Sequence, residues 1–442
     1  MSGSSATEGL EGVSRRQMAM AIIASLLGWS LDLFDLFILL YVAPIIGKLF
    51  FPSDVPTLSL AAVYASFAVT VLMRPVGSAL FGPFADLRGR KGAMIVAVVG
   101  VGVTTAALGA LPTIQQVGLL APVLFLVLRL VQGIFVGGVV ASTHTIGTET
   151  VPAHWRGALS GLVGVGGAGI GGVFASIIYL ITAEIFPGDQ FAVWGWRIMF
   201  FSGILSAVLG VFVFSSLEES PVWAALKRRA ATAGAAPVQA PLRAMFSRQW
   251  RGLLVANVLL CIGGGGGYYI TSGYLPTFLK LVSKIPNRDA SLILIGCNLV
   301  AIAASLIMGH LSTFWGRRRV FIITGLLRLV LLPLCYFAMA RAGDDIWTLV
   351  FYAVVMVFLA NGSFAPLLIY LNERYPTAIR STGTGVSWNI GFAIGGMMPT
   401  FVSLASPTTQ DLPAGLAWFS VGLAAVFLLG AFVSPETRRE LG

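Results

Sequence analysis

Twelve separate runs of apolar residues, spaced almost evenly along the chain, constrain its fold more than any other feature. Each run is long enough for a helix that crosses a bilayer, which needs about 20 apolar residues. The runs are continuous rather than alternating, so they favour helices over a membrane β-barrel. The predicted spans cover residues 19–46, 59–84, 92–111, 117–145, 158–182, 197–216, 252–279, 290–312, 320–340, 346–372, 382–404 and 412–433. The sequence therefore predicts an all-α membrane protein.

The charged residues support this interpretation. They make up only 10% of the 442 residues, whereas a soluble domain carries about 25%. Nineteen Lys and Arg residues fall between spans on the side of the N-terminus and six on the other side, which predicts that both termini are cytoplasmic. Topology thus explains the net charge of +10 without a nucleic-acid partner. We expect a monomeric, multi-pass protein of a bacterial inner membrane, in contact with the lipid bilayer.

Two motifs occur twice and divide the spans into two sets of six. Gly82-x3-Asp86-x2-Gly89-Arg90 follows the second span, and Gly309-x3-Thr313-x2-Gly316-Arg317 follows the eighth, 227 residues later. Glu149-x2-Pro152-x3-Arg156 follows the fourth span, and Glu373-x2-Pro376-x3-Arg380 follows the tenth, 224 residues later. Two motifs repeated at nearly one offset indicate a duplicated six-helix unit, and parallel repeats of this kind are a known transporter architecture.

The domain organisation follows from this duplication. We predict a cytoplasmic tail at 1–18, a six-helix bundle at 19–216, a cytoplasmic loop at 217–249, a second bundle at 250–433 and a cytoplasmic tail at 434–442. The loop is the longest connection between spans, which is where two six-helix units are expected to be joined.

With these motifs the chain resembles the major facilitator superfamily over nearly its whole length. The loop Gly82–Lys91 matches that superfamily's signature between spans two and three, and Arg129-x2-Gln132-Gly133 resembles its fourth-span motif. The resemblance implies twelve transmembrane helices in two pseudo-symmetric six-helix bundles that work by alternating access. Three further stretches are similar to proton symporters of organic acids and small metabolites, including the sialate and aromatic-acid branches: Leu31-Asp32-Leu33-Phe34-Asp35, Arg74-Pro75-Val76-Gly77 and Tyr274-Leu275-Pro276-Thr277-Phe278-Leu279.

Four charged residues lie well inside the spans of the first half, away from the span ends. Asp32 and Asp35 lie three residues apart near the middle of the first span and so share a helix face. Arg74 and Arg129 lie in the second and fourth spans, and each such charge costs about 2.5–3.5 kcal/mol on insertion scales. Two buried carboxylates on one face favour the uptake of a proton. We predict that Asp32 or Asp35 binds the transported proton with Arg129 as its electrostatic partner; a purely structural ion-pair network is the alternative.

Protonation of one aspartate would leave this set with a net positive charge, which favours an anionic substrate. The sequence therefore predicts symport of a small organic anion, a carboxylate, with protons; the proton gradient supplies the energy, and no cofactor or metal is expected. The candidate substrate-binding residues are polar or aromatic residues of the spans: Arg129, Arg74, Gln132, Tyr268, Tyr269, Asn361 and Asn389. A sugar or polyol symporter and a drug-type proton antiporter of the same fold remain open.

The repeated motifs also predict a cytoplasmic gate, because they bring opposite charges to helix ends on one side of the membrane. Its candidate residues are Gly82, Asp86, Gly89, Arg90, Glu149, Arg156, Gly309, Gly316, Arg317, Glu373 and Arg380. Topology and helix capping are the alternative explanation of these charges. The roles of Arg328 and His144 stay open between packing and transport. No nucleophile–base pair, metal cluster or nucleotide motif is found in the sequence, so an enzyme is not expected.

Overall fold

The computed structural model describes residues 15–88, 90–149, 154–215, 247–376 and 379–437. For residues 15–21, 24, 82–83, 85–88, 90, 139–149, 214 and 381 it describes the backbone alone. The described residues are helical or in short connections and contain no strand. Most of the predicted loop 217–249 and parts of both predicted tails lie outside them, so those domain boundaries stay predictions.

The helices of the first half run from α1 to α10. Their bounds are α1 Arg15–Phe50, α2 Pro56–Leu72, α3 Arg74–Arg88, α4 Arg90–Ala110, α5 Ile114–Val117, α6 Leu120–Glu149, α7 Arg156–Gly161, η1 Leu162–Gly166, α8 Gly167–Ile185, η2 Phe191–Gly195, α9 Trp196–Phe201 and α10 Gly203–Ser215. The elements labelled η are short π-helices.

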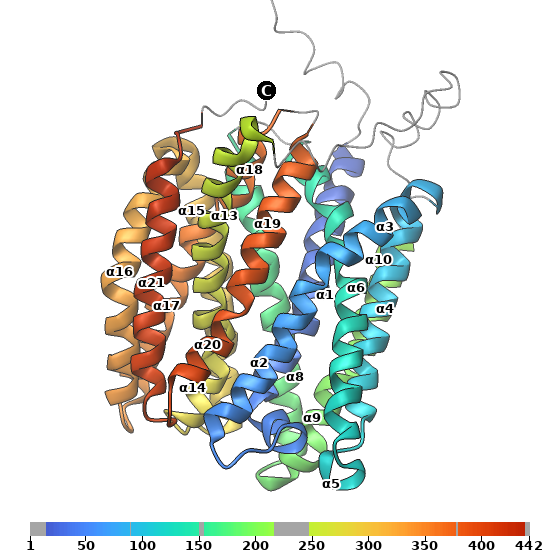
Figure 1. Cartoon of the computed structure of the whole chain (residues 1–442), viewed down its shortest axis with the longest axis vertical. Coiled ribbons are helices and arrows are strands. Elements are labelled where there is room, and N and C mark those ends of the chain that lie inside the picture. The colour runs from blue at the N-terminus through green and yellow to red at the C-terminus, as the bar shows by residue number, and fades with distance from the viewer. Residues whose placement is uncertain (1–14, 89, 150–153, 216–246, 377–378, 438–442) are drawn as a thin grey trace, which may run out of the picture.

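The second half runs from α13 to α21. Its bounds are α13 Arg248–Tyr268, η3 Tyr269–Gly273, α14 Leu275–Leu281, α15 Asn287–Trp315, α16 Arg317–Arg341, α17 Ile346–Phe364, α18 Leu367–Arg374, α19 Arg380–Gly396, α20 Met398–Ala405 and α21 Leu412–Val433. In Figure 1 these yellow to red helices stand beside the blue to green helices of the first half.

Eleven segments of the described chain are long and apolar enough to cross a membrane. They correspond to eleven of the predicted spans; Leu412–Val433, for example, matches the predicted 412–433. The remaining predicted span, 382–404, is occupied by α19 and α20, which meet at Met397. Pro399 lies at the start of α20 and has no N–H for a helical hydrogen bond, which explains the break. The predicted fold class, twelve helices in two six-helix bundles, is confirmed.

Several spans are broken near their middle, and prolines account for most of the breaks. Pro75 follows the break between α2 and α3, Pro276 the one between η3 and α14, and Pro366 the one between α17 and α18. Each proline removes a backbone donor and so frees a carbonyl of the preceding turn. Broken helices within a membrane are tolerated where the surrounding protein satisfies the freed groups. These breaks lie next to the residues that form the candidate site.

The two halves meet along two seams. The fifth span, formed by α7, η1 and α8, packs against α15, while α1 packs on α14 and α2 packs on α20. At the first seam the backbones touch: a Cβ atom on Gly157 would lie 2.4 Å from the carbonyl oxygen of Gly309. The thiols of Cys261, Cys297 and Cys335 are all free and buried in the second half.

Candidate functional site

A buried ion pair joins α1 to the start of α3. Nη2 of Arg74 lies 3.3 Å from Oδ2 of Asp32, and the two side chains are 3% and 0% exposed. Arg74 is the first residue after the break at Met73, so the helix break sets its position beside α1. Removing one partner of such a pair leaves an uncompensated buried charge, which costs about 3–5 kcal/mol.

A second polar cluster lies one helical turn further along α1. Oδ2 of Asp35 accepts a hydrogen bond of 2.9 Å from Ser206 on α10. Arg129 on α6 interacts electrostatically with Asp35, and its Nη1 donates to Oε1 of Gln132 at 2.5 Å. Gln132 in turn donates to Thr105 on α4 at 2.7 Å. The four predicted charges therefore form two clusters, Asp32 with Arg74 and Asp35 with Arg129.

Several atoms of these clusters have no hydrogen-bond partner among the described residues. They are Oδ1 of Asp32, Oδ1 of Asp35, Nε of Arg74, and Nε and Nη2 of Arg129. Most buried polar atoms in folded proteins are bonded, so each exception calls for an explanation. An unbonded carboxylate oxygen can take up a proton, and an unbonded guanidinium nitrogen can bind a substrate group, while the other hydrogen bonds of the cluster stay in place.

A narrow cavity lies between the two halves beside the first cluster. Its lining residues are Trp29, Leu33, Arg74, Gly164, Val165, Ala168, Tyr268, Tyr269, Phe364, Trp388 and Phe392. Among the described residues of this lining, Arg74 is the one charged residue, and the others are mainly aromatic and small. Trp388 stacks on Phe392 at 4.0 Å between ring centroids, and Nε1 of Trp29 donates to the carbonyl of Gly164 at 2.6 Å. The cavity thus combines one cation with an aromatic wall formed by Trp29, Tyr268, Tyr269, Phe364, Trp388 and Phe392.

The family model described as sugar (and other) transporter matches residues 20–440. The chain belongs to that family. It is a secondary transporter of the major facilitator superfamily, a multi-pass membrane protein rather than an enzyme.

Relatives and solved structures extend the match over almost the whole chain. The "Inner membrane metabolite transport protein YhjE" of Escherichia coli K12 is 27% identical over 95% of this chain and 94% of its own length. A "Proline/betaine transporter" of Salmonella typhimurium is 27% identical over 96% of this chain and 85% of its own. The crystal structure of a D-xylose-proton symporter has the same fold, with a TM-score of 0.71 at 18% identity, over 96% of this chain and 99% of that one.

The transporter's cavity contains some of the residues that the sequence singled out and not others. Arg74, Tyr268 and Tyr269 line it. Arg129 and Gln132 lie in the second cluster instead. Nδ2 of Asn361 on α17 donates a hydrogen bond of 2.9 Å to the hydroxyl of Ser272 in η3. Asn389 is half-buried and outside the lining.

Sequence reasoning found Tyr268 and Tyr269 but missed the four other residues of the aromatic wall, Trp29, Phe364, Trp388 and Phe392. The available signal was weak: Trp388 and Phe392 are four residues apart on one helix face, but aromatic residues at that spacing are common in any buried helix.

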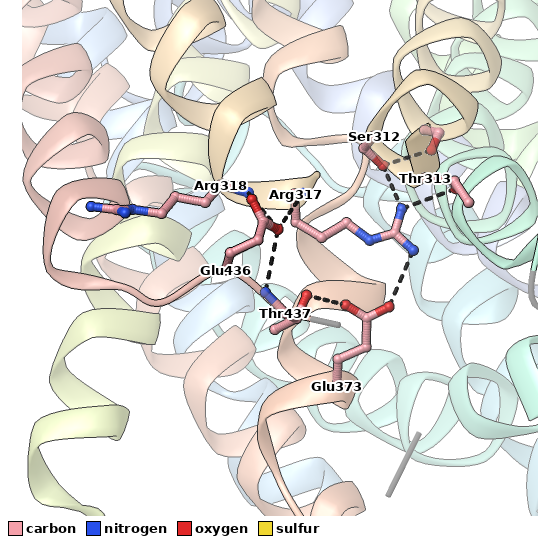
Figure 2. A network of polar contacts seen from close by, with 8 residues as sticks. Ser312, Thr313, Arg317, Arg318, Glu373, Glu436 and Thr437 are labelled. Atoms are coloured by element: carbon pink, nitrogen blue, oxygen red, sulfur yellow. Dashed lines mark hydrogen bonds and ion pairs between the residues drawn. The ribbon is translucent and has the colours of Figure 1, made fainter. Parts of the chain in front are cut away.

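A polar network joins α15, α16, α18 and the C-terminal segment at the end of the molecule where the described chain terminates (Figure 2). Nη2 of Arg317 lies 3.1 Å from Oε1 of Glu373, and Nη1 donates to Ser312 at 2.5 Å. Both charged partners belong to the second half, so this ion pair does not itself link the halves. Arg317 nevertheless borders the seam, because a Cβ atom on Gly157 would lie 2.5 Å from its Nη1.

The C-terminal segment completes this network. Oε1 of Glu436 accepts from the backbone N–H of Arg317 at 2.7 Å, and Thr437 donates to Glu373. The sequence analysis did not find Glu436. A Ser-Pro pair with an adjacent glutamate follows both the sixth and the last spans, as Glu219-Ser220-Pro221 and as Ser434-Pro435-Glu436. The glutamate stands on opposite sides of the two pairs, so the available signal was weak.

The other predicted gate residues divide into two groups. In the described group, Gly309 forms the seam with Gly157, and Gly316 adopts a left-handed φ of +96° that favours glycine. Arg380 is buried and donates to the carbonyl of Tyr375. Arg156 is half-buried. Gly89 and the side-chain positions of Gly82, Asp86, Arg90, Glu149 and His144 lie outside the described residues.

Proposed function

We propose that this transporter carries a small carboxylate together with protons. One observation supports the proposal most: Arg74 belongs both to the buried ion pair with Asp32 and to the lining of the cavity. A substrate carboxylate in the cavity would therefore meet the same guanidinium that neutralises Asp32.

Competition for Arg74 supplies the coupling. When a substrate carboxylate binds Arg74, Asp32 loses its counter-charge in a buried site, and its protonated form becomes the more stable one. When Asp32 binds a proton, Arg74 is released for the substrate. Proton and anion thus favour each other's binding by the same free energy, as linkage requires. Asp32 is the proposed proton site, and Asp35 with Arg129 supports it from the second cluster.

Alternating access would then move this site between the two sides of the membrane. The proton gradient is the proposed energy source, and no cofactor takes part. The Arg317–Glu373 network and the repeated motif of the first half would act as the gate on the cytoplasmic side, where we place both termini. The protein would work as a monomer in a bacterial inner membrane.

A second candidate substrate is a zwitterionic carboxylate that also carries an ammonium group. The aromatic wall of Trp29, Tyr268, Tyr269, Phe364, Trp388 and Phe392 supports this candidate, because aromatic faces attract quaternary ammonium groups. Relatives named as proline/betaine transporters point in the same direction. Arg74 would take the carboxylate in either case, so the two candidates differ only in the group that meets the aromatic wall.

Uptake into proteoliposomes under an imposed inward proton gradient tests the proposal. Labelled mono-, di- and aromatic carboxylates, betaine, proline and xylose form the panel. Asp32→Asn and Asp35→Asn are compared with wild type, and the exposed Asp54→Asn is the matched control.

Gradient-driven uptake of a carboxylate or betaine, lost in Asp32→Asn and retained in Asp54→Asn, is the expected result. Uptake of xylose alone, or proton-driven efflux of lipophilic compounds, would contradict the carboxylate. Uptake of a carboxylate that persists under the gradient in Asp32→Asn would instead contradict the proton site.

A further inference from the structure

Among the described residues of the second half, Arg328 is a buried cation near the middle of a span, and neither the proposed coupling mechanism nor the network of Arg317 uses it. Arg328 lies near the middle of α16 and is 0% exposed. Arg328 forms no ion pair with a carboxylate of the described residues. A charge inside a membrane span is costly and usually functional, so the contacts of this guanidinium identify what it does.

The guanidinium of Arg328 joins two other spans. Nη1 donates to the hydroxyl of Ser363 on α17 at 3.0 Å, and Nη2 donates to the carbonyl of Gly263 on α13 at 2.8 Å. The group also lies over the ring of Phe427, 5.1 Å from its centroid. Hydrogen bonds from a charged donor are worth about 1.5–3 kcal/mol each, so these bonds hold both helices firmly.

Both acceptors lie next to residues of the cavity wall. Ser363 directly precedes Phe364, the last residue of α17 before its break. Gly263 opens a run of five glycines that leads to Tyr268 and Tyr269, where α13 changes into the π-helix η3. Phe364, Tyr268 and Tyr269 all line the cavity. One side chain on a third span therefore connects two separate parts of the aromatic wall.

The glycine run needs such an external support. Glycine weakens a helix by about 1 kcal/mol relative to alanine because it gains backbone freedom in other states. A second residue of α16, Tyr336, lies about two turns further on and donates to the carbonyl of Ile270 in η3 at 2.9 Å. The helix α16 thus fastens the segment 263–270 at both ends.

The glycines in turn make room for the guanidinium. A Cβ atom on Gly267 would lie 1.9 Å from Nη2 of Arg328, so the guanidinium would have to move to make room for it. Arg328 and the glycine run are therefore complementary: the absence of a side chain at position 267 allows the contact that stabilises the run.

We propose that Arg328 is a positioning residue for the substrate cavity. Through Gly263 and Ser363 it holds Tyr268, Tyr269 and Phe364 in place, and it takes no part in proton coupling. The proposal rests on the transport function of the family and holds whichever substrate the cavity takes.

Three variants interrupt this arrangement in different ways. Arg328→Lys keeps the charge but loses the planar guanidinium whose two Nη atoms bond α13 and α17. Ser363→Ala removes the hydroxyl that accepts from Nη1. Gly267→Ala adds a Cβ atom where Nη2 lies and so displaces the guanidinium. Gly296→Ala is the matched control, because nothing lies within 4 Å of its added Cβ atom. Ser363→Ala and Gly267→Ala keep the proposal testable if the change at Arg328 reduces the yield of folded protein.

Two measurements are made on each purified, full-length variant. In proteoliposomes, with the transported member of the panel, we expect KM to rise about tenfold in Arg328→Lys and Gly267→Ala and less in Ser363→Ala. The maximal rate and the pH profile of uptake should match wild type. Hydrogen–deuterium exchange should accelerate over residues 263–273 in all three variants, with no change over 120–138 and none in Gly296→Ala.

The exchange measurement needs no substrate, so it decides the proposal even if no carboxylate is transported. Exchange over 263–273 at the wild-type rate in all three variants would overturn the positioning role. An altered pH profile of uptake in Arg328→Lys would overturn it as well, because Arg328 would then belong to the proton-coupling machinery.

Discussion

The first half of the transporter buries two aspartates and two arginines within its spans, whereas the second half buries Arg328 with hydroxyl and carbonyl partners. Counted at the offset of the first repeated motif, Asp32, Asp35, Arg74 and Arg129 correspond to Leu259, Ile262, Ala301 and Met356, all of them apolar. The halves therefore share their helices and their motifs at the helix ends, but not their buried charges. In the proposed mechanism the first half carries the coupling charges, while both halves line the cavity and the second half contributes most of its aromatic side chains.

The largest effect is expected from Arg74→Met, which leaves Asp32 without its partner. Breaking a buried pair lowers the stability of the fold by about 3–5 kcal/mol. Because Arg74 is also the proposed ligand of the substrate carboxylate, proton-driven uptake should fall at least about a hundredfold, which corresponds to about 3 kcal/mol of lost binding. The double variant Arg74→Met/Asp32→Asn should recover the yield of folded protein but not uptake. Arg288→Met, in the exposed pair with Glu184, is the control and should transport normally. Uptake within threefold of wild type in Arg74→Met would remove the first cluster from the mechanism.

The pH dependence of uptake sharpens the comparison between the halves. A lower pH outside favours the protonated form of Asp32, so uptake by wild type should rise as the external pH falls, by about tenfold from pH 8 to pH 6. Substrate exchange by Asp32→Asn should be independent of pH, because asparagine does not titrate. Arg328→Lys should keep the wild-type profile. If both variants lost the pH dependence, the assignment of coupling to the first half alone would be wrong.

A smaller effect is expected at the network of Arg317. Arg317→Met removes the ion pair with Glu373 and the hydrogen bond to Ser312. This network restrains helix ends and does not bind substrate, so we expect uptake to fall about fivefold with KM unchanged. The melting temperature should drop by several degrees, which is about the shift that follows a loss of a few kcal/mol of stability. Arg319→Met is the neighbouring exposed control. A rise in KM would show that the network also shapes the cavity.

The smallest effect is expected from Glu436→Gln. Glutamine keeps an oxygen that can accept from the N–H groups of Arg317 and Arg318, but it loses the negative charge near the start of α16. Favourable charges at helix ends contribute about 0.3–1 kcal/mol, so the melting temperature should fall by only about 1–2 °C with uptake unchanged. Glu184→Gln serves as the surface control. A drop as large as that of Arg317→Met would make the C-terminal segment an equal partner in the network.

The sequence was sufficient for the spans and for the residues that carry charge. A run such as 412–433 is long, apolar and uninterrupted, so its physics is local and the helix Leu412–Val433 follows directly. The presence of charges at Asp32, Asp35, Arg74 and Arg129 within spans was equally plain. For such features no knowledge of tertiary contacts is needed.

The pairing of these charges could not be predicted in the same way. The sequence named Arg129 as the partner of whichever aspartate binds the proton, Asp32 or Asp35, and did not say which arginine lies beside which aspartate. The break at Met73 places Arg74 next to Asp32. The aromatic wall combines Trp29, Tyr268, Phe364 and Trp388 from four different spans, and no local pattern connects them. Contacts of this kind depend on how helices cross, which residue spacing does not encode.

The burial of Cys261, Cys297 and Cys335 has a practical consequence for spectroscopy. All three cysteines are at most 3% exposed. Water-soluble thiol reagents should therefore not label them and should react only with cysteines introduced at the surface. Leu119 in one half and Trp347 in the other are 78% and 80% exposed and lie in short connections or at a helix start. A pair of spin labels at these two positions would report the proposed movement of one half against the other as a distance distribution, with the natural cysteines left in place.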